Sequence, residues 1–303
     1  MKKIKIYITG GTGFIGRELI LRLNKSLNKV IIKEISRNKS KDKINLANFN
    51  EVYDSISKFK PDIIVHLAAS GVTRNTEDLS NFVNFNLLST INILETIKNL
   101  RNSPLFVNFG TAYEYKHNKN KLTENSNLNP MSLYAWSKTS SYYLLKTYQD
   151  KARILNLRLF NIYGPKEPNG RLIPYLLDCV CNKEIAQTTN GSQIRDFMYI
   201  DDLIIIIEKI IFKQWERSNF FKTVNIGTGR PCSIKKFINL IKKELHKRSL
   251  ALEVDFNAIS PRKEDPLVCV SNNNEMLRLI GKIDFISNQV GIERYLNEYY
   301  KDT

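Results

Sequence analysis

The feature that most constrains the fold is a cluster of glycines near the start of the chain, at positions 10, 11, 13 and 16. The apolar run 4–8 precedes the cluster, and the helix-forming segment 17–23 follows it. A strand, a glycine turn and a helix in this order bring backbone N–H groups close to a diphosphate, so the pattern predicts a dinucleotide-binding turn. Glycines that only shape a tight turn are the simpler alternative. The residues expected to contact the cofactor here are Gly10, Thr12, Gly13, Phe14, Ile15 and Gly16.

Composition limits the class of protein. The chain has 303 residues, 42% of them hydrophobic, which suits one large domain with a smaller companion. No apolar run approaches the ~18 residues of a membrane helix, and the start of the chain leads into a strand rather than a signal peptide. We therefore expect a cytoplasmic protein with no membrane partner. The four cysteines form no CxxC pair and no cluster with the three histidines, so the sequence indicates neither a metal site nor a disulfide framework.

The formal charge of +16 raises the question of a nucleic-acid partner. The lysines are scattered along the whole chain, and no basic stripe with interleaved aromatic residues is present. We therefore expect no nucleic-acid partner, although a positive field would attract an anionic nucleotide substrate.

The second expected strand, 30–35, ends where an adenine ribose would lie. An acidic residue there would bind the 2′-hydroxyl of NAD, whereas Arg37 with Ser36 suits the 2′-phosphate of NADP. The sequence therefore favours NADP(H) as cofactor. NAD(H) stays open, because a shift in strand register would bring Glu34 to the ribose.

A third apolar run, 61–69, is typical of a parallel strand that is covered on both faces. Leu67, Ala68 and Ala69 stand at its end, where the small side chains leave room for the cofactor. We interpret His66 as a packed core residue rather than a catalyst. Two helices should follow, one at about 77–100 and a second from near position 133, and two such helices could pair across a homodimer as a four-helix bundle.

The next segments carry the residues that we expect to take part in the reaction. A buried strand, 105–109, delivers Thr111 to the carboxyl edge of the sheet, where ligands bind in open α/β folds. Tyr134 and Lys138 are four residues apart and share one helical face. A neighbouring ammonium should lower the pKa of a tyrosine from its usual value near ~10, and the lysine can also hold ribose hydroxyls. A threonine hydroxyl at the same place can hydrogen-bond a substrate carbonyl.

These motifs together resemble the extended short-chain dehydrogenase/reductase family, in particular the enzymes that modify nucleotide-linked sugars for surface polysaccharides. The resemblance covers nearly the full length, through segments 10–16, 66–69, 134–138, 158–165, 195–203 and 224–229. It implies that Thr111, Tyr134 and Lys138 form the catalytic set, with Tyr134 and Lys138 also touching the cofactor.

The resemblance also implies that Asn161, Arg195 and Arg262 contact the nucleotide diphosphate. Arginine suits this role, because its planar fork donates paired, charge-assisted hydrogen bonds. Arg171 could add a third positive group. The residues expected to contact the substrate are Thr111, Tyr113, Asn161, Arg171, Arg195 and Arg262.

Three reactions compete within the family. Its dehydratases follow the catalytic threonine with an acidic pair, but here the acid, Glu114, is displaced by one position, and only a slipped loop would return it to the site. An epimerase retains its cofactor, whereas a reductase consumes NADPH once, which Arg37 favours. Segments 171–179 and 193–197 resemble the abequose and paratose synthases, which are 4-ketoreductases of CDP-linked 4-keto-6-deoxy sugars.

The predicted activity is therefore hydride transfer to the sugar C4 carbonyl, with Tyr134 as proton donor. The fuller segment 110–115 departs from those synthases and leaves the nucleotide and the sugar open. A protein that binds the dinucleotide without turnover is the alternative from another class. Such relatives tend to lose the tyrosine or the lysine, and both are present here.

The predicted architecture is an α/β fold: a doubly wound parallel sheet (Rossmann) with a smaller, interleaved α/β lobe for the substrate. The dinucleotide-binding domain should comprise 1–164 plus about 197–226. The nucleotide-sugar-binding lobe should comprise about 165–196 plus 227–303, with the cleft between the two.

Overall fold

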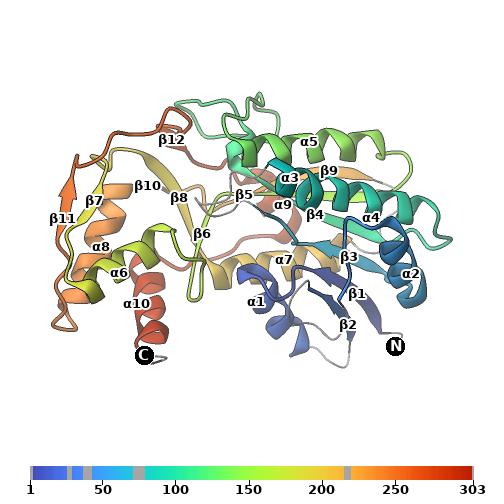
Figure 1. Ribbon diagram of the computed structural model, residues 1–303, viewed down its shortest axis with the longest axis horizontal. Helices are drawn as coiled ribbons and strands as arrows, with labels where there is room; N and C mark the ends of the chain where they lie inside the picture. Colours follow the sequence, from blue (N-terminus) through green and yellow to red (C-terminus); the bar gives the residue numbers. More distant parts are fainter. Residues whose placement is uncertain (1–2, 26–28, 37–42, 71–78, 215–219, 302–303) are drawn as a thin grey trace.

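A six-stranded sheet forms the centre of the larger part of the molecule (Figure 1). The structure is a computed structural model, and it describes residues 3–25, 29–36, 43–70, 79–214 and 220–301. The strand order is β2-β1-β3-β4-β5-β9, and every neighbouring pair is parallel. The strands are β1 (Ile4–Thr9), β2 (Val30–Ile35), β3 (Ile63–His66), β4 (Leu105–Thr111), β5 (Arg153–Leu159) and β9 (Phe221–Ile226). The predicted doubly wound parallel sheet is confirmed.

Alternating side chains give the sheet two buried faces. Ile6 and Ile8 of β1 face one core, whereas Tyr7 between them faces the other. The first core is closed by helices α1 (Phe14–Asn24), α7 (Ile200–Gln214) and α9 (Asn274–Ile280). The second is closed by α2 (Phe49–Phe59), α4 (Ser89–Lys98) and α5 (Leu133–Thr147). This three-layer packing explains why the strands read as nearly continuous apolar runs.

The smaller lobe lies at the end of the molecule away from β2 (Figure 1). It contains a sheet of order β10-β8-β12, with β6 also paired to β8, and a separate pair of strands, β7 and β11. The strands are β6 (Asn161–Tyr163), β7 (Ala186–Thr188), β8 (Ile194–Tyr199), β10 (Pro231–Ser233), β11 (Val254–Phe256) and β12 (Val268–Cys269). Helices α6 (Leu172–Asn182), α8 (Ile234–His246) and α10 (Asn288–Tyr299) complete the lobe.

Strand β8 corrects the predicted division of the chain. The sequence assigned residues from about 197 to the dinucleotide-binding domain, but β8 pairs with β6 and β10 in the small sheet. The rest of that segment belongs to the large part as predicted: α7 packs beside α1, and β9 pairs with β5 in the large sheet. The pairing partners of β8 come from both sides of it in the chain, and a local apolar pattern does not report such pairing.

The helix expected over about 77–100 is also different in detail. From residue 79 onward it consists of α3 (Leu79–Phe82), a π-helical turn η1 (Val83–Leu88) and α4, and residues 71–78 lie outside the described part. The turn contains Asn86, which is buried and fully engaged in hydrogen bonds. Such π-turns occur frequently at functional sites.

Across the part of the chain that the structure describes, none of the helices is both long and apolar enough to cross a bilayer.

Candidate active site

The glycine turn lies at the switch point of the sheet, where the strand order reverses between β1 and β3. Gly10 has a φ of +71°, and a Cβ there would lie 2.6 Å from the backbone nitrogen of Ala68. A Cβ on Gly16 would collide with the carbonyl oxygen of Gly10. Gly13 caps α1 without any side-chain hydrogen bond, so the N–H groups at the helix start remain available to a ligand.

A cavity of about 260 Å³ opens beside this turn. Thr12 Oγ1 lies 2.8 Å from Ser36 Oγ and thereby ties the turn to the end of β2. The predicted cofactor residues that line this cavity are Gly10, Thr12, Gly13, Ser36, Leu67, Ala68 and Ala69. The close approach allowed by glycine, the available helix N-terminus and the small lining residues fit a dinucleotide.

The residues expected to choose between the two nicotinamide cofactors are only partly described. Arg37 lies outside the described residues. Glu34 pairs with Ile8 in the register of β1 and β2, and its side chain packs against Gly11. The carboxyl group therefore stands beside the glycine turn without any shift in strand register.

Replacing Gly16 with alanine is expected to weaken cofactor binding more than about tenfold, equivalent to ~1.4 kcal/mol. The added methyl group would push the helix start away from the Gly10 carbonyl. Titration of the protein with NADPH, followed by nucleotide fluorescence, measures the effect. Gly281→Ala is the control, because Gly281 lies after α9, lines neither cavity, and has no atom of the described residues beyond its chain neighbours within 4 Å of an added Cβ. Equal losses of affinity in both variants would contradict the assignment.

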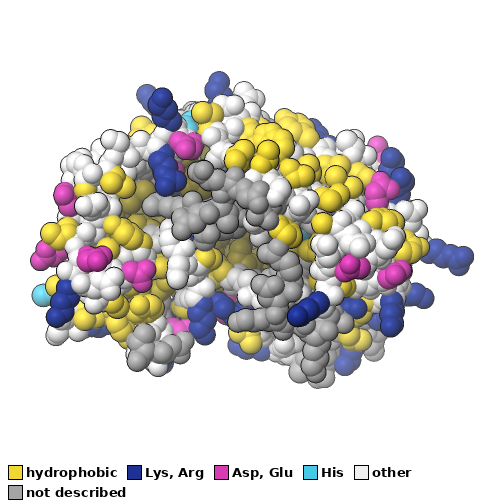
Figure 2. Space-filling model, viewed as in Figure 1, with side chains coloured by type: hydrophobic (Ala, Val, Ile, Leu, Met, Phe, Trp, Pro, Cys, Tyr) yellow, Lys and Arg dark blue, Asp and Glu magenta, His cyan; other side chains and the backbone are white. Residues whose placement is uncertain are grey.

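A second cavity, of about 410 Å³, adjoins the first, and Leu67 and Ala69 line both. It lies between the two lobes, and the face of the molecule in Figure 2 is hollowed there. The predicted residues that line it are Ile15, Thr111, Tyr113, Tyr134, Lys138, Asn161, Arg171 and Arg195. Phe14 and Gly16 line neither cavity; Phe14 lies under the guanidinium of Arg171.

Tyr134 and Lys138 come from the first turns of α5, where the Ser132 side chain accepts a hydrogen bond from the Ala135 N–H. Burial lowers the pKa of Lys138 to about 8, with Glu114 opposing the shift. Burial raises the pKa of Tyr134 to about 12, and the charge of Glu114 adds to this rise. The predicted lowering of the tyrosine pKa is therefore wrong. Removing a phenolate from water costs more free energy than the positive charge of Arg171 gives back. Tyr134 keeps its proton at neutral pH.

The π-helical turn holds α5 in place. Asn86 Nδ2 donates to Ser137 Oγ at 2.9 Å, and its Oδ1 accepts the N–H of Ser70 at 2.8 Å. The carbonyl of Asn86 accepts the hydroxyl of Ser141 at 2.8 Å. Asn86 thus links the segment after β3 to the helix that carries Tyr134 and Lys138.

Thr111 is the last residue of β4, and a buried ion pair holds its backbone in place. Glu114 accepts the Thr111 N–H at 2.7 Å, and Arg158 Nε donates to Glu114 at 2.7 Å. Glu114 is fully buried and lines neither cavity. The slipped loop that would bring this acid to the substrate is therefore not observed.

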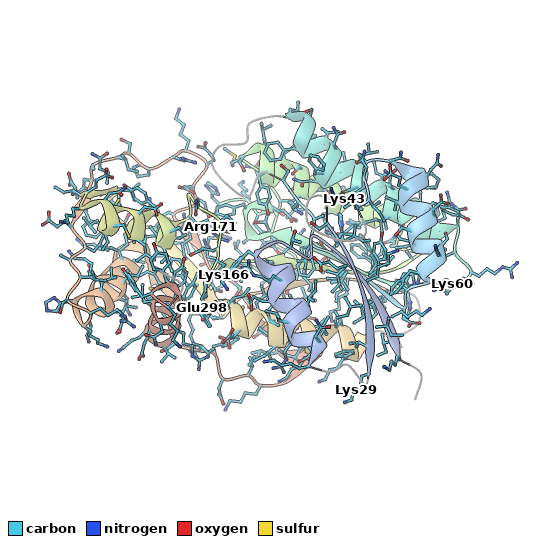
Figure 3. All side chains as sticks on the ribbon, turned by 60° about the horizontal axis from the view of Figure 1, so that its bottom comes forward. Lys29, Lys43, Lys60, Lys166, Arg171 and Glu298 are labelled. Carbon is cyan, nitrogen blue, oxygen red and sulfur yellow. The ribbon has the colours of Figure 1, made fainter. Side chains whose placement is uncertain are left out.

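The predicted arginines lie in different surroundings. Arg195 is buried and donates to the Pro266 carbonyl at 2.6 Å, and Arg171 donates to the Ile162 carbonyl at 2.7 Å. Figure 3 places Arg171 near Lys166 and Glu298, at the side that carries α6 and α10. Arg262 is exposed in the loop between β11 and β12 and is not among the residues that line the cavity.

Two acidic residues of the cavity were missed by sequence reasoning, Glu167 and Asp265. Neither belongs to a motif, and only the fold brings them to the substrate side. His66 is confirmed as a packed core residue, since burial lowers its pKa to about 3. Its Nδ1 lies 2.8 Å from Thr9 Oγ1 and its Nε2 lies 3.3 Å from Ser89 Oγ, partners that the sequence did not reveal.

Comparison with known proteins agrees with this geometry. The model of the NAD dependent epimerase/dehydratase family matches residues 6–227. Protein CapI of Staphylococcus aureus is 28% identical over 98% of this chain and 100% of its own length. CDP-abequose synthase of Salmonella muenchen is 26% identical over 97% of both chains. The structure of a Bacillus cereus UDP-glucuronic acid 4-epimerase, bound to UDP-glucuronic acid and NAD, superposes with a TM-score of 0.85 at 21% identity, covering 99% of this chain and 100% of that one.

Proposed function

The chain belongs to the NAD dependent epimerase/dehydratase family, and on that premise we propose that it reduces the C4 carbonyl of a nucleotide-linked 4-keto-6-deoxy sugar with NADPH. The observation that carries the proposal is the composition of the larger cavity. Thr111, Tyr134 and Lys138 line it together with Arg195, whereas the acid that a dehydratase would need, Glu114, is buried behind the strand. NADPH consumption in proportion to added sugar tests the proposal.

The residues of the cavity have separate roles in this reaction. The reduced nicotinamide supplies the hydride when it is bound. Tyr134, which is protonated at neutral pH, donates the proton to the carbonyl oxygen. The Thr111 hydroxyl donates a hydrogen bond to the negative charge that develops on that oxygen. Lys138 holds the ribose hydroxyls through its ammonium group.

Two polar residues support binding of the diphosphate. Asn161 extends from β6 into the cavity, and Arg195 of β8 lines the same wall. Carbonyl hydrogen bonds fix the orientation of the Arg195 guanidinium, which is only 3% exposed. A pre-oriented arginine binds the diphosphate more tightly, because little side-chain entropy is lost on binding.

A nucleotide-sugar 4-epimerase with retained NAD is the second candidate. The observation in its favour is Glu34, which packs against Gly11, where a carboxylate could reach the 2′-hydroxyl of an adenine ribose. Arg37, two residues beyond the end of β2, favours NADPH and the reductase. Conversion of the sugar to an isomer without consumption of NADPH would identify the epimerase.

We propose that the protein forms a homodimer, as the sequence predicts. Leu133, Trp136 and Tyr143 of α5 are large hydrophobic residues with 43–55% of their surface exposed, which supports pairing of this helix in a homodimer. The cytoplasmic location stays a prediction.

Affinity for NADPH is expected to fall as the pH rises through about 8. Lys138 is charged below that pH and neutral above it, because burial lowers its pKa from 10.5 to about 8. Dissociation constants measured from about pH 6 to pH 10 by nucleotide fluorescence give the profile. Lys138→Met should remove this inflection, whereas Lys146→Met, a change near the other end of α5, should retain it. An inflection that persists in Lys138→Met would assign it to another group.

A further inference from the structure

Glu167 is a buried acid in the larger cavity that the proposed reaction does not use. It lies in the loop after β6, between Gly164 and Arg171, and only 7% of its surface is exposed. Its Oε2 forms an ion pair with Arg171 Nε at 3.2 Å, whereas its Oε1 is buried without a hydrogen-bond partner among the described residues.

A buried carboxylate oxygen without a hydrogen-bond donor has lost its hydration without replacement and destabilises the fold. Most buried polar groups in native structures are hydrogen-bonded, and among the buried atoms without a partner in the described residues Glu167 Oε1 belongs to a residue that lines the larger cavity, where a ligand could supply the donor. Burial raises the pKa of Glu167 to about 7, although the charge of Arg171 and a hydrogen bond from Tyr295 of α10 to the carboxyl group act in the opposite direction. The buried Oε1 of Glu167 therefore destabilises the fold, and its residue lines the larger cavity.

Two of the three cations that line the cavity, Arg171 and Arg195, are already engaged by groups of the protein, whereas Lys138 is assigned to the ribose. Arg171 uses Nε for Glu167 and Nη2 for the Ile162 carbonyl. Arg195 donates to the Pro266 carbonyl and lies 3.8 Å from Asp265. A carboxylate on the sugar would thus meet the negative charge of Glu167 while the nearby Arg171 is already paired, and like charges so placed weaken binding.

We propose that Glu167 determines the class of sugar: its Oε1 accepts a hydrogen bond from a hydroxyl group of an uncharged sugar and rejects a hexuronic acid. This inference rests on the proposed function, because it assumes that the cavity holds a nucleotide-linked sugar. The 4-keto-6-deoxy sugar of the proposed function is itself uncharged, so the inference adds which residue, outside the catalytic set, excludes a charged sugar.

Calorimetric titration with UDP-glucose and UDP-glucuronic acid tests the inference, because the two ligands share a nucleotide and differ only at C6. The titration is run near pH 8, where Glu167 is mostly ionised. The wild-type protein should bind UDP-glucose at least about tenfold more tightly, and Glu167→Gln should reduce this ratio towards one, since the amide can donate to a carboxylate. Glu293→Gln, an exposed change on α10, should leave the ratio unaltered. The thermal midpoints of both variants verify that they fold.

Equal binding of the two ligands to the wild type, or an unchanged ratio in Glu167→Gln, would overturn the inference alone. The readout is binding, so it does not depend on turnover or on NADPH. If neither UDP-linked ligand binds, the same pair of sugars is compared on CDP, GDP and dTDP. Failure with every nucleotide would instead count against a nucleotide-sugar site, and therefore against the proposed function itself.

Discussion

Replacing Tyr134 with phenylalanine is expected to lower kcat by about 10²- to 10⁴-fold, the usual contribution of a positioned proton donor. The phenol lines the larger cavity, and its pKa of about 12 keeps it protonated at neutral pH. Phenylalanine retains the ring and removes only the donor, so the dissociation constants of cofactor and substrate should change less than about threefold. Turnover is followed by the absorbance of the reduced nicotinamide, and binding by calorimetry.

Tyr143→Phe is the matched control for this prediction. Tyr143 lies on the same helix, but 55% of its surface is exposed and it lines neither cavity. Its variant should turn over like the wild type. Near wild-type turnover in Tyr134→Phe would show that another group donates the proton.

Replacing Glu114 with alanine should reduce the free energy of unfolding by about 3–5 kcal/mol. The change leaves the guanidinium of Arg158 fully buried without its carboxylate partner. The rings of Tyr115 and Tyr142, with centroids 4.7 and 4.4 Å from the guanidinium carbon, do not replace that charge. Urea unfolding followed by circular dichroism measures the loss.

Arg294→Ala provides the comparison for that measurement. Arg294 pairs with Asp201 at 3.1 Å, and both side chains are half exposed, so solvent screens the pair and its loss should cost less than about 1 kcal/mol. Similar losses in the two variants would contradict the claim that the Glu114–Arg158 pair anchors the end of β4.

Much of the fold could be predicted from local patterns. The strand expected over 30–35 is β2, with the same bounds, because apolar residues flanked by turn residues define a short buried strand well. Thr111 could be placed at the ligand-binding edge of the sheet because a parallel strand ends there, and Tyr134 and Lys138 could be placed on one helical face by their spacing. That the three form one set was implied by the family resemblance. Their presence in one cavity agrees with that reasoning.

Other features depend on contacts that no local pattern records. The π-turn around Asn86 arises from hydrogen bonds to Ser70 and Ser137, which are distant in the chain. The raised pKa of Tyr134 comes from burial by the whole fold, and spacing to a lysine does not report burial. Glu167 lines the cavity because the loop after β6 forms part of its wall.

The most direct test of the central claim is the absorbance of NADPH while the purified protein meets a panel of nucleotide-linked 4-keto-6-deoxy sugars, with NADH run in parallel. We predict loss of the band in proportion to the amount of one sugar, faster with NADPH than with NADH. Conversion of a sugar to its isomer with the band unchanged would contradict the reductase and establish an epimerase instead.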